Sequence, residues 1–555
     1  MLRKILGRCL TGAAVAVLCV APAQAANDNF EKDVGLSIDK GLTWLDSAGA
    51  FNNPSSAGDA AGLTLLALLE KRASGIASDP PQGYSGASAA DQARMRRVIR
   101  YIINSASSQG AGFYAYRDGG YMMALSLYMR TGGVDKDDGP TTELDGAPLT
   151  LIQTLNLVFD RTIANQRKGL GGGDGNNGYW CYTNNGCLDA STTQLTLSGL
   201  AGARAVYSSG GFAPDAARAA QLDAATLLAR KAYAANGTPG GGGCNPSAGE
   251  KGHGYNVGST NSLQQTSSGV WAQLVGGADV NDPNVQAYLR WVYNHYRHSN
   301  INGNDWSGQS TWYYLWTATK AWEFIENSGV APNAGNLMPS DLGTLPSGSA
   351  PACANREVHV DPASVPRVPL FGANPAGYYD EVKDWYFDYA YMILTHQCAT
   401  GRYNCLGAPG YWNDYSSQAY ALLVLQRSVG GGCVDTDGDG ACDEIDNCRN
   451  TVNPGQEDGD KDGVGDVCDN CPKVANADQK DTDKDGIGDA CEIAKCDLDS
   501  DGDIDSADIR LITALRGKTV PPAPVAADYD DNKYININDA RGCTLKCTRP
   551  SCATQ

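Results

Sequence analysis

The feature that most constrains this chain is a set of aspartates at alternate positions near its C-terminal end. The pattern Asp-x-Asp-x-Asp-Gly-x-x-Asp occurs at 435–443, 458–466 and 481–489. Alternate carboxylates converge on one side of a tight loop, and glycine at the sixth position allows the sharp turn. Oxygen donors in this arrangement suit Ca²⁺. The predicted ligands are Asp435, Asp437, Asp439, Asp443, Asp458, Asp460, Asp462, Asp466, Asp481, Asp483, Asp485 and Asp489.

Two longer loops follow, at 497–508 and 528–539. Each places oxygen donors at positions 1, 3, 5, 7, 9 and 12, which is the EF-hand order of ligands. A helix is expected to leave the first loop at 509–515. Position 6 is Gly502 in the first loop and Lys533 in the second, so the second turn is expected to be strained or its affinity lower. The predicted ligands are Asp497, Asp499, Asp501, Asp503, Asp505, Asp508, Asp528, Asp530, Asn532, Tyr534, Asn536 and Asp539.

The charge of the chain is concentrated in this same segment. The formal net charge is −19, and residues 433–555 hold 28 acidic and 13 basic residues. A segment this acidic repels itself unless it is neutralised. Its cysteines, glycines and regular aspartate spacing argue against a disordered tail. We therefore expect Ca²⁺ as the cofactor and no nucleic acid partner.

With their cysteines and Asn/Gln-containing spacers, the three shorter loops resemble thrombospondin type 3 repeats across residues 433–492. The resemblance implies a nearly coreless wrap around Ca²⁺, with bridges Cys448–Cys468 and Cys471–Cys491. Residues 496–555 resemble a type I dockerin, because each longer loop is followed by one helix and lacks an entering helix. Positions 10 and 11 of these loops lack the Ser/Thr pair that clostridial dockerins often offer to cohesin. This second resemblance therefore implies a calcium-dependent docking or stability module without implying a cellulosome.

The N-terminal residues predict export. Arg3, Lys4 and Arg8 precede an apolar stretch at about 10–20, and small residues end at Ala25. This is typical of a secretory signal peptide at 1–25, because the apolar stretch is too short to span a bilayer. No later segment is long and apolar enough to be a membrane span. We expect a soluble protein that is secreted or held at the cell surface.

Cysteine usage agrees with export, since sixteen of the 18 cysteines lie beyond residue 25. An even number in an exported chain indicates disulfides. Zinc is the rival interpretation, but the chain has only five histidines and the clustered cysteines lie among aspartates. Close pairs that are candidates for local bridges are Cys181/Cys187, Cys398/Cys405 and Cys547/Cys552. Cys543, Cys547 and Cys552 are expected to staple the last helix.

Residues 27–430 form a repetitive body. Each unit has an amphipathic run, a Gly-rich loop with aromatics, and an Ala/Leu-rich run led by Ser, Thr or Gln, as at 178–200 and 410–423. The Ser and Thr residues are expected to be N-caps, so the second run of each unit predicts a buried inner helix. Runs such as 91–103 and 285–296 predict outer helices. Alternating helices of this kind close most simply into a ring with its loops at one end.

This pattern resembles the α/α toroid of terpene cyclases and protein prenyltransferase β-subunits. The resemblance implies a mainly α fold for the body. Together with the two resemblances of the tail, the expected architecture is an α/α toroid followed by small calcium-bound, disulfide-stapled modules with little regular structure and a dockerin-like EF-hand pair. It does not imply cyclase activity. The closest match to the acidic cyclase motif, at 135–138, stands in a Gly/Pro-rich loop, and the zinc ligands of prenyltransferases have no clear counterpart. Residues 327–380 are expected to be a long loop or insertion.

The body carries aromatic residues beside carboxylates in its loops, and these would meet at one mouth of a ring. Such a surface suits a sugar polymer, although packing and capping explain the same residues. We favour a calcium-binding protein whose toroid binds an extracellular partner or glycan, with the calcium modules as rigid spacer and docking unit. The alternatives are a polysaccharide lyase or glycoside hydrolase and, less favoured, an isoprenoid cyclase-like enzyme, so catalysis stays open. The candidate substrate-binding residues are Trp180, Asp189, Tyr255, Asp305, Trp306, Trp412 and Asp414.

Overall fold

The structure is a computed structural model of the 555-residue chain. It describes residues 29–77, 79–138, 143–208, 211–240, 249–299, 311–345, 356–371, 377–403, 413–430, 446–448, 450–453, 457–481, 486–499, 503–530, 532–548 and 550–553. The signal-peptide prediction for 1–25 lies outside these residues. So do the site predictions for Asp305, Trp306, Trp412, Asp435, Asp437, Asp439, Asp443, Asp483, Asp485 and Asp501. None of the helices in the described ranges combines the length and apolarity that crossing a membrane requires.

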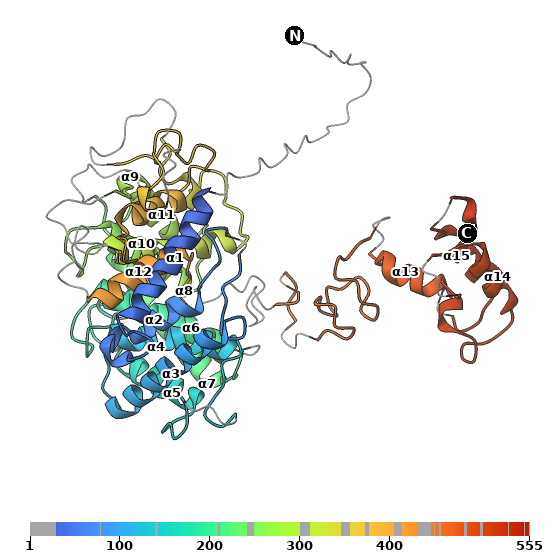
Figure 1. The fold of residues 1–555 in the computed structure, drawn as a ribbon, viewed down its shortest axis with the longest axis horizontal. Coiled ribbons are helices and arrows are strands. Elements are labelled where there is room, and N and C mark those ends of the chain that lie inside the picture. Colours follow the sequence, from blue (N-terminus) through green and yellow to red (C-terminus); the bar gives the residue numbers. More distant parts are fainter. Residues whose placement is uncertain are drawn as a thin grey trace, which may run out of the picture.

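Across the described residues the regular structure is helical, and extended segments pair only through isolated bridges. Figure 1 shows α1 to α12 gathered in one body, with α14 and α15 together in a smaller unit. The helices of the body are α1 (Asn29–Ser47), α2 (Ala61–Leu69), α3 (Ala89–Gln109), α4 (Ala115–Arg130), α5 (Leu151–Ala164), α6 (Ala190–Tyr207), α7 (Ala216–Asn236), α8 (Leu263–Val275), α9 (Pro283–His295), α10 (Thr311–Asn327), α11 (Trp385–His396) and α12 (Asp414–Leu425). The tail has α13 (Asp489–Cys496), α14 (Ser506–Ala514) and α15 (Ile537–Leu545).

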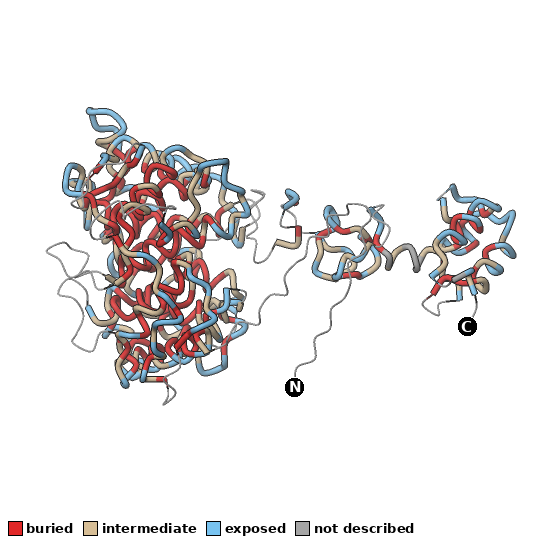
Figure 2. The backbone as a smooth tube through the Cα atoms, turned by 90° about the horizontal axis from the view of Figure 1, so that it is seen from above, coloured by how far each residue is buried: buried red, intermediate tan, exposed pale blue. Residues whose placement is uncertain are grey.

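The even-numbered helices of the body form a closed circuit of contacts. Along the chain α2 contacts α4, and the contacts continue through α6, α8 and α10 to α12, which contacts α2. Every residue of α2 and α8 is buried, and Figure 2 shows buried residues filling this body. The odd-numbered helices pack outside the circuit, as α3 does on α2 and α9 on α8, and bury only one face. The body therefore has an inner set of helices that are buried over most or all of their length and an outer amphipathic set.

The inner helices begin earlier than the sequence predicted. Ser191 and Ser416 were expected to be N-caps, but they lie inside the first turns of α6 and α12. The cap of α6 is Asp189, whose carboxylate accepts the main-chain N–H of Thr192 at 2.9 Å. The cap of α12 is Asn413. Carboxylate and amide oxygens satisfy these first-turn donors, while hydroxyls inside the helices donate to carbonyls one turn back, as Thr196 does to Thr192 at 2.9 Å.

A buried carboxylate joins α4 to α5. Asp118 is fully buried and accepts two hydrogen bonds from the Arg161 guanidinium, at 2.6 and 2.9 Å. Arg117 donates to the same carboxylate at 2.8 Å. Arg161 also donates to the main-chain oxygen of Gly110 at 3.0 Å, so it connects the end of α3 to this pair. Removing Arg161 would leave Asp118 buried with only part of its compensation.

We expect Arg161→Met to lower the free energy of unfolding by roughly 3 kcal/mol, because an ion left without its buried partner is strongly destabilising. Chemical denaturation followed by circular dichroism measures this. The matched control is Arg218→Met, which breaks a pair with the half-exposed Asp160 and should cost at most about 1 kcal/mol. Equal losses of unfolding free energy in the two variants would contradict the conclusion that the buried pair of Asp118 and Arg161 contributes more than a half-exposed pair.

A lysine lies in the middle of the helical circuit. Lys320 on α10 is fully buried, its Nζ is 2.7 Å from Ser198 Oγ, and it lies 3.8 Å from the centroid of the Trp316 ring. Burial lowers the pKa of Lys320 well below its usual value. At pH values between the lowered pKa of folded Lys320 and the ordinary lysine pKa of about 10, the unfolded chain binds more protons than the folded chain. Stability therefore rises with pH over that range.

Lys320→Met should accordingly raise the melting temperature at pH 7, and this gain should shrink near pH 10. Methionine fills a similar volume and needs no proton to be shed on folding. Thermal unfolding of both proteins at the two pH values measures the effect. A variant that is less stable than the parent at pH 7 would show instead that the charged ammonium of Lys320 stabilises the folded protein.

Candidate metal centre and ligand cavity

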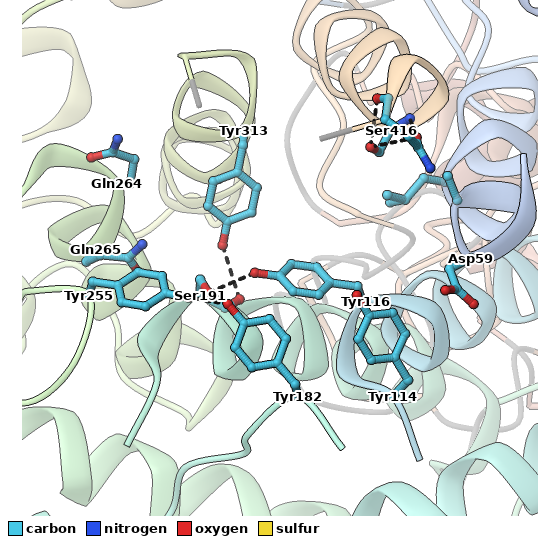
Figure 3. Close-up of a pocket in the computed structure, with 13 residues that line it drawn as sticks. Asp59, Tyr114, Tyr116, Tyr182, Ser191, Tyr255, Gln264, Gln265, Tyr313 and Ser416 are labelled. Atoms are coloured by element: carbon cyan, nitrogen blue, oxygen red, sulfur yellow. Dashed lines mark hydrogen bonds between the residues drawn. The ribbon is translucent and has the colours of Figure 1, made fainter. Parts of the chain in front are cut away.

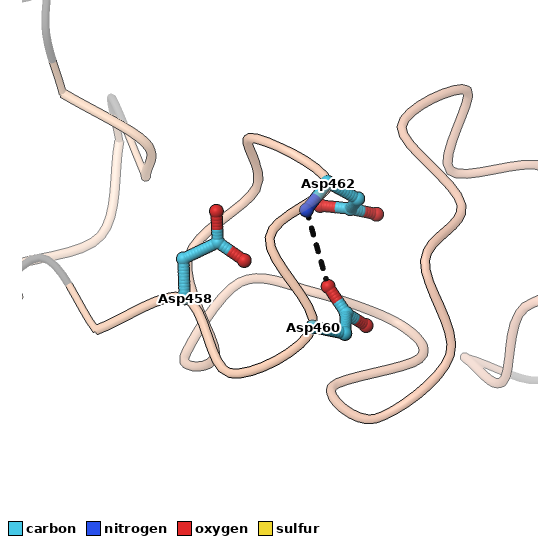
Figure 4. Close-up of side chains that lie close together, drawn as sticks. All are labelled: Asp458, Asp460 and Asp462. Atoms are coloured by element: carbon cyan, nitrogen blue, oxygen red, sulfur yellow. Dashed lines mark hydrogen bonds between the residues drawn. The ribbon is translucent and has the colours of Figure 1, made fainter.

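The loop at 458–466 brings its aspartates together as the sequence predicted. Asp458, Asp460 and Asp462 each offer a carboxylate oxygen, and these oxygens lie within 4.8 Å of one another (Figure 4). Gly463 has φ +95° and its N–H donates to Asp458 Oδ2 at 3.0 Å. Asp466 accepts the N–H of Gly459 at 2.7 Å. Desolvation and the neighbouring carboxylates raise the pKa of Asp460, as expected where like charges converge.

The loop that begins at Asp481 has the same hydrogen bond between its first and sixth residues. Gly486 has φ +92° and donates its N–H to Asp481 Oδ2 at 3.0 Å, as Gly463 does to Asp458 in the preceding loop. The side chain of Asp489, at the start of α13, is not among those described. Glycine at position six therefore has the same role in both loops, which is a left-handed residue whose N–H holds the first carboxylate.

These loops are joined by disulfides and amides, with little apolar packing. Both bridges that the resemblance implied, Cys448–Cys468 and Cys471–Cys491, are confirmed. Asn453 donates to Asn447 at 2.8 Å, and 23 residues later Asn476 donates to Asn470 at 2.7 Å. Among the described residues of 446–481, the buried side chains are cysteines, asparagines and one aspartate: Cys448, Asn453, Asp469, Cys471 and Asn476. The disulfides therefore take over part of the stabilising role that a core has elsewhere.

The two longer loops bring carboxylates together in the same way as each other. One oxygen group comes from Asp497, Asp499 and Asp508, and a second comes from Asp503, Asp505 and Asp508. The third comes from Asp528, Asp530 and Asp539. Asp508 and Asp539, both at position 12, are fully buried and accept the N–H of the second loop residue at 2.7 and 2.9 Å. The described parts of the two loops thus share the same contact at position 12.

Asp528 has a buried carboxylate oxygen that fits a bound cation. Its side chain is 2% exposed, and Oδ1 has no hydrogen-bond partner among the described residues. A buried carboxylate oxygen without a partner costs free energy unless a cation binds it. The neighbours of Asp528 offer only oxygen atoms for coordination, which suits a hard ion such as Ca²⁺. Asn536 lies in the same loop, and its Nδ2 donates to the main-chain oxygen of Tyr534 at 3.2 Å.

A small core and a long-range disulfide support these loops. Ile504, Ile512 and Ile535 are fully buried in one cluster. Cys496 at the end of α13 is bonded to Cys543 on α15, and Cys547 is bonded to Cys552. The predicted local pair Cys547/Cys552 is confirmed, as is Cys181/Cys187 in the body. Cys398 is disulfide-bonded, while Cys405 lies outside the described residues. The pair Cys496–Cys543 was not predicted, because sequence spacing says little about partners 47 residues apart.

The body contains a cavity of about 490 Å³ at the common end of the inner helices (Figure 3). Tyrosines dominate its wall, and Tyr182 and Tyr255 are hydrogen-bonded to each other through their hydroxyls. Tyr116 bonds Ser191 Oγ at 2.8 Å, and Tyr313 donates to the main-chain oxygen of Ser191 at 3.1 Å. The wall residues are Asp59, Ala60, Leu63, Tyr114, Tyr116, Tyr182, Ser191, Tyr255, Gln264, Gln265, Tyr313, Asn413 and Ser416.

Only one of the predicted substrate-binding residues that the structure describes lines this cavity. That residue is Tyr255. Trp180 is fully buried and its indole N–H donates to the main-chain oxygen of Thr162 at 2.8 Å, so it packs in the core. Asp189 is the buried cap of α6, and Asp414 bonds Arg402 at the start of α12. Helix capping was one of the roles expected for these residues, and it is the role that Asp189 has in the structure.

Several wall residues were missed by sequence reasoning. Tyr114, Tyr116 and Tyr182 lie in the Gly/aromatic loops that define the repeats, but they were not among the candidate substrate-binding residues. Asp59 precedes α2, whose run at 61–69 was not included in the repeat pattern. Burial raises the pKa of Asp59 above its usual value. It is the only carboxylate among the described wall residues.

Lys533 provides a test of the second long loop. It occupies position six with φ +63°, and its N–H donates to Asp528 Oδ2 at 2.8 Å, as glycine does in the shorter loops. The left-handed conformation costs a lysine about 1 kcal/mol more than a glycine. Lys533→Gly should therefore raise thermal stability and tighten Ca²⁺ binding. Lys533→Ala removes the same charge but keeps the Cβ, and it should bring no such gain in melting temperature. A gain of equal size in both variants would mean that charge, and not backbone strain, limits this loop.

Comparison with known families agrees with the loop geometry. Residues 432–456, 456–479 and 480–509 each match the thrombospondin type 3 repeat. The third match runs past Cys491 to residue 509, and so includes the first of the two longer loops. No curated protein sequence and no solved structure matches the chain. Thrombospondin type 3 repeats are calcium-binding extracellular modules, so residues 432–509 of this chain are similar to modules of that kind.

Proposed function

We propose that this chain is an exported calcium-binding protein in which an acidic tail, folded around Ca²⁺, carries a helical body that binds an extracellular partner or glycan. Support for calcium comes from three matches to a calcium-binding repeat and from four groups of converging carboxylates. Support for export comes from the disulfides and from the extracellular nature of that repeat. In this proposal residues 1–25 are a signal peptide, so the secreted protein would begin at Ala26.

The observation that carries the proposal is the arrangement around Asp528. Three carboxylates from Asp528, Asp530 and Asp539 converge within 4.8 Å, and the unpartnered oxygen of Asp528 is buried among them. Like charges at this distance repel strongly where water is excluded. A divalent cation held by these oxygens would turn that repulsion into attraction.

The finer assignments of fold belong to the same proposal. We assign residues 27–430 to an α/α toroid like that of the terpene cyclases and prenyltransferases, supported by the closed circuit of α2 to α12. We assign residues 496–555 to a dockerin-like EF-hand pair, supported by two equivalent loops that lead into α14 and α15. The thrombospondin-like segment at 433–492 would act as a rigid spacer, and the last module as a docking unit.

Titration calorimetry of the oxidised, metal-free full chain tests the calcium proposal. Addition of CaCl₂ should give saturable heat, and Asp528→Asn/Asp539→Asn should remove the part that belongs to the second long loop. The matched control is Asp160→Asn, a half-exposed aspartate on α5, which should leave the isotherm unchanged. A parent protein that gives no heat with Ca²⁺ would refute the proposal.

A further inference from the structure

The tyrosine-lined cavity is formed by the starts of six inner helices. Tyr114 and Asn413 are the N-cap residues of α4 and α12, while Ser191, Gln264 and Tyr313 lie in the first turns of α6, α8 and α10. Asp59 comes directly before α2. Most wall residues are held at helix starts within a closed circuit, while Tyr182 and Tyr255 come from the loops before α6 and α8 and are hydrogen-bonded to each other. The wall is therefore pre-formed, and no large rearrangement is needed to build it.

The wall is both aromatic and rich in uncharged polar groups. Five tyrosines supply flat rings with hydroxyl tips. Gln264, Gln265 and Asn413 supply amides, which both donate and accept hydrogen bonds, and Ser191 and Ser416 supply hydroxyls. A polyhydroxylated ring matches this mixture, because its hydroxyls also donate and accept while its apolar faces can lie on tyrosine.

The charge of the cavity excludes the main rival ligands. Among the described wall residues there is no lysine, arginine or histidine, and the one ionisable carboxyl is Asp59. A prenyl diphosphate or a polyuronate needs cationic partners in a partly enclosed site. Helix starts attract anions, but Asp189 and Asn413 already accept first-turn N–H groups of α6 and α12. An uncharged isoprenoid chain would leave the amides of the wall without partners.

We propose that this cavity binds a neutral oligosaccharide, with Tyr255 and Tyr182 as its aromatic face and Gln265 as a hydrogen-bonding contact. The inference rests on the proposed function, since it names the ligand of the same helical body. It does not depend on the calcium loops, because none of the wall residues lies in the tail. Failure of saccharide binding would therefore leave the calcium titration unaffected, and the two proposals can fail separately.

The test is calorimetry of the oxidised full chain in saturating CaCl₂ against a fixed set of probes. The neutral probes are cellohexaose, xylohexaose, mannohexaose and maltohexaose, and the anionic ones are hexagalacturonate and farnesyl diphosphate. At least one neutral probe should bind saturably, and its affinity should be the same in 50 and 500 mM NaCl because no ion pairs are formed. Binding of none of the neutral probes, or tighter binding of an anionic one, would overturn the proposal.

Variants then locate the binding site. Tyr255→Ala and Gln265→Ala should each weaken binding of the neutral probe by roughly tenfold, the effect of losing one aromatic or hydrogen-bonding contact. Tyr379→Ala is the matched control, because Tyr379 is 55% exposed and lies outside the wall, and it should bind as the parent does. Circular dichroism and the melting temperature show whether each variant is folded. Unchanged affinity in folded Tyr255→Ala and Gln265→Ala would place the saccharide elsewhere and refute the assignment.

Discussion

The convergence of carboxylates in the tail loops is the interaction on which that part of the structure depends. Asp458, Asp460 and Asp462 approach one another without a core behind them, and the described residues around them bury cysteines and asparagines. A chain segment with so little apolar surface cannot offset its loss of conformational entropy by burial. Disulfides limit the unfolded chain, but they leave the repulsion among the aspartates in place. In the proposed function a bound cation would remove that repulsion, so metal binding and folding of this segment would be one event.

The helical body is stabilised by a different physical effect. Its inner helices are buried over almost their whole surface, and large side chains such as Trp180, Trp271 and Trp316 are fully enclosed. The buried carboxylate of Asp118 is paired with Arg161. The body should therefore fold and persist without calcium. Its cavity is expected to be rigid as well, since most wall residues lie at the starts of the inner helices.

Features set by local spacing could be predicted from sequence, and features set by distant contacts could not. The ligand loops repeat a fixed order of aspartates, so Asp458, Asp460 and Asp462 could be identified from their neighbours alone. The bridge Cys471–Cys491 followed from the repeat to which it belongs. The bridge Cys496–Cys543 did not, because it depends on how α13 meets α15.

The residues of the cavity wall show more clearly that features set by distant contacts could not be predicted from sequence. An aromatic residue next to a carboxylate looked like a binding site at Trp180 and Asp189, but one is a core residue and the other a helix cap. Which side chains face the cavity depends on how six helices are rotated about their axes. That rotation cannot be read from local patterns in one sequence. Asp59 and Tyr313 became wall residues only when distant helices were brought together.

The most direct test of the central claim is limited proteolysis of the oxidised full chain, with Ca²⁺ and with EDTA, followed by mass mapping of the cuts. Calcium-dependent folding of the tail predicts that chelation exposes new cleavage sites after residue 430 and lowers the melting transition of that part. The fragment containing α1 to α12 should stay intact in both conditions. The same digestion pattern with and without chelator would contradict the account.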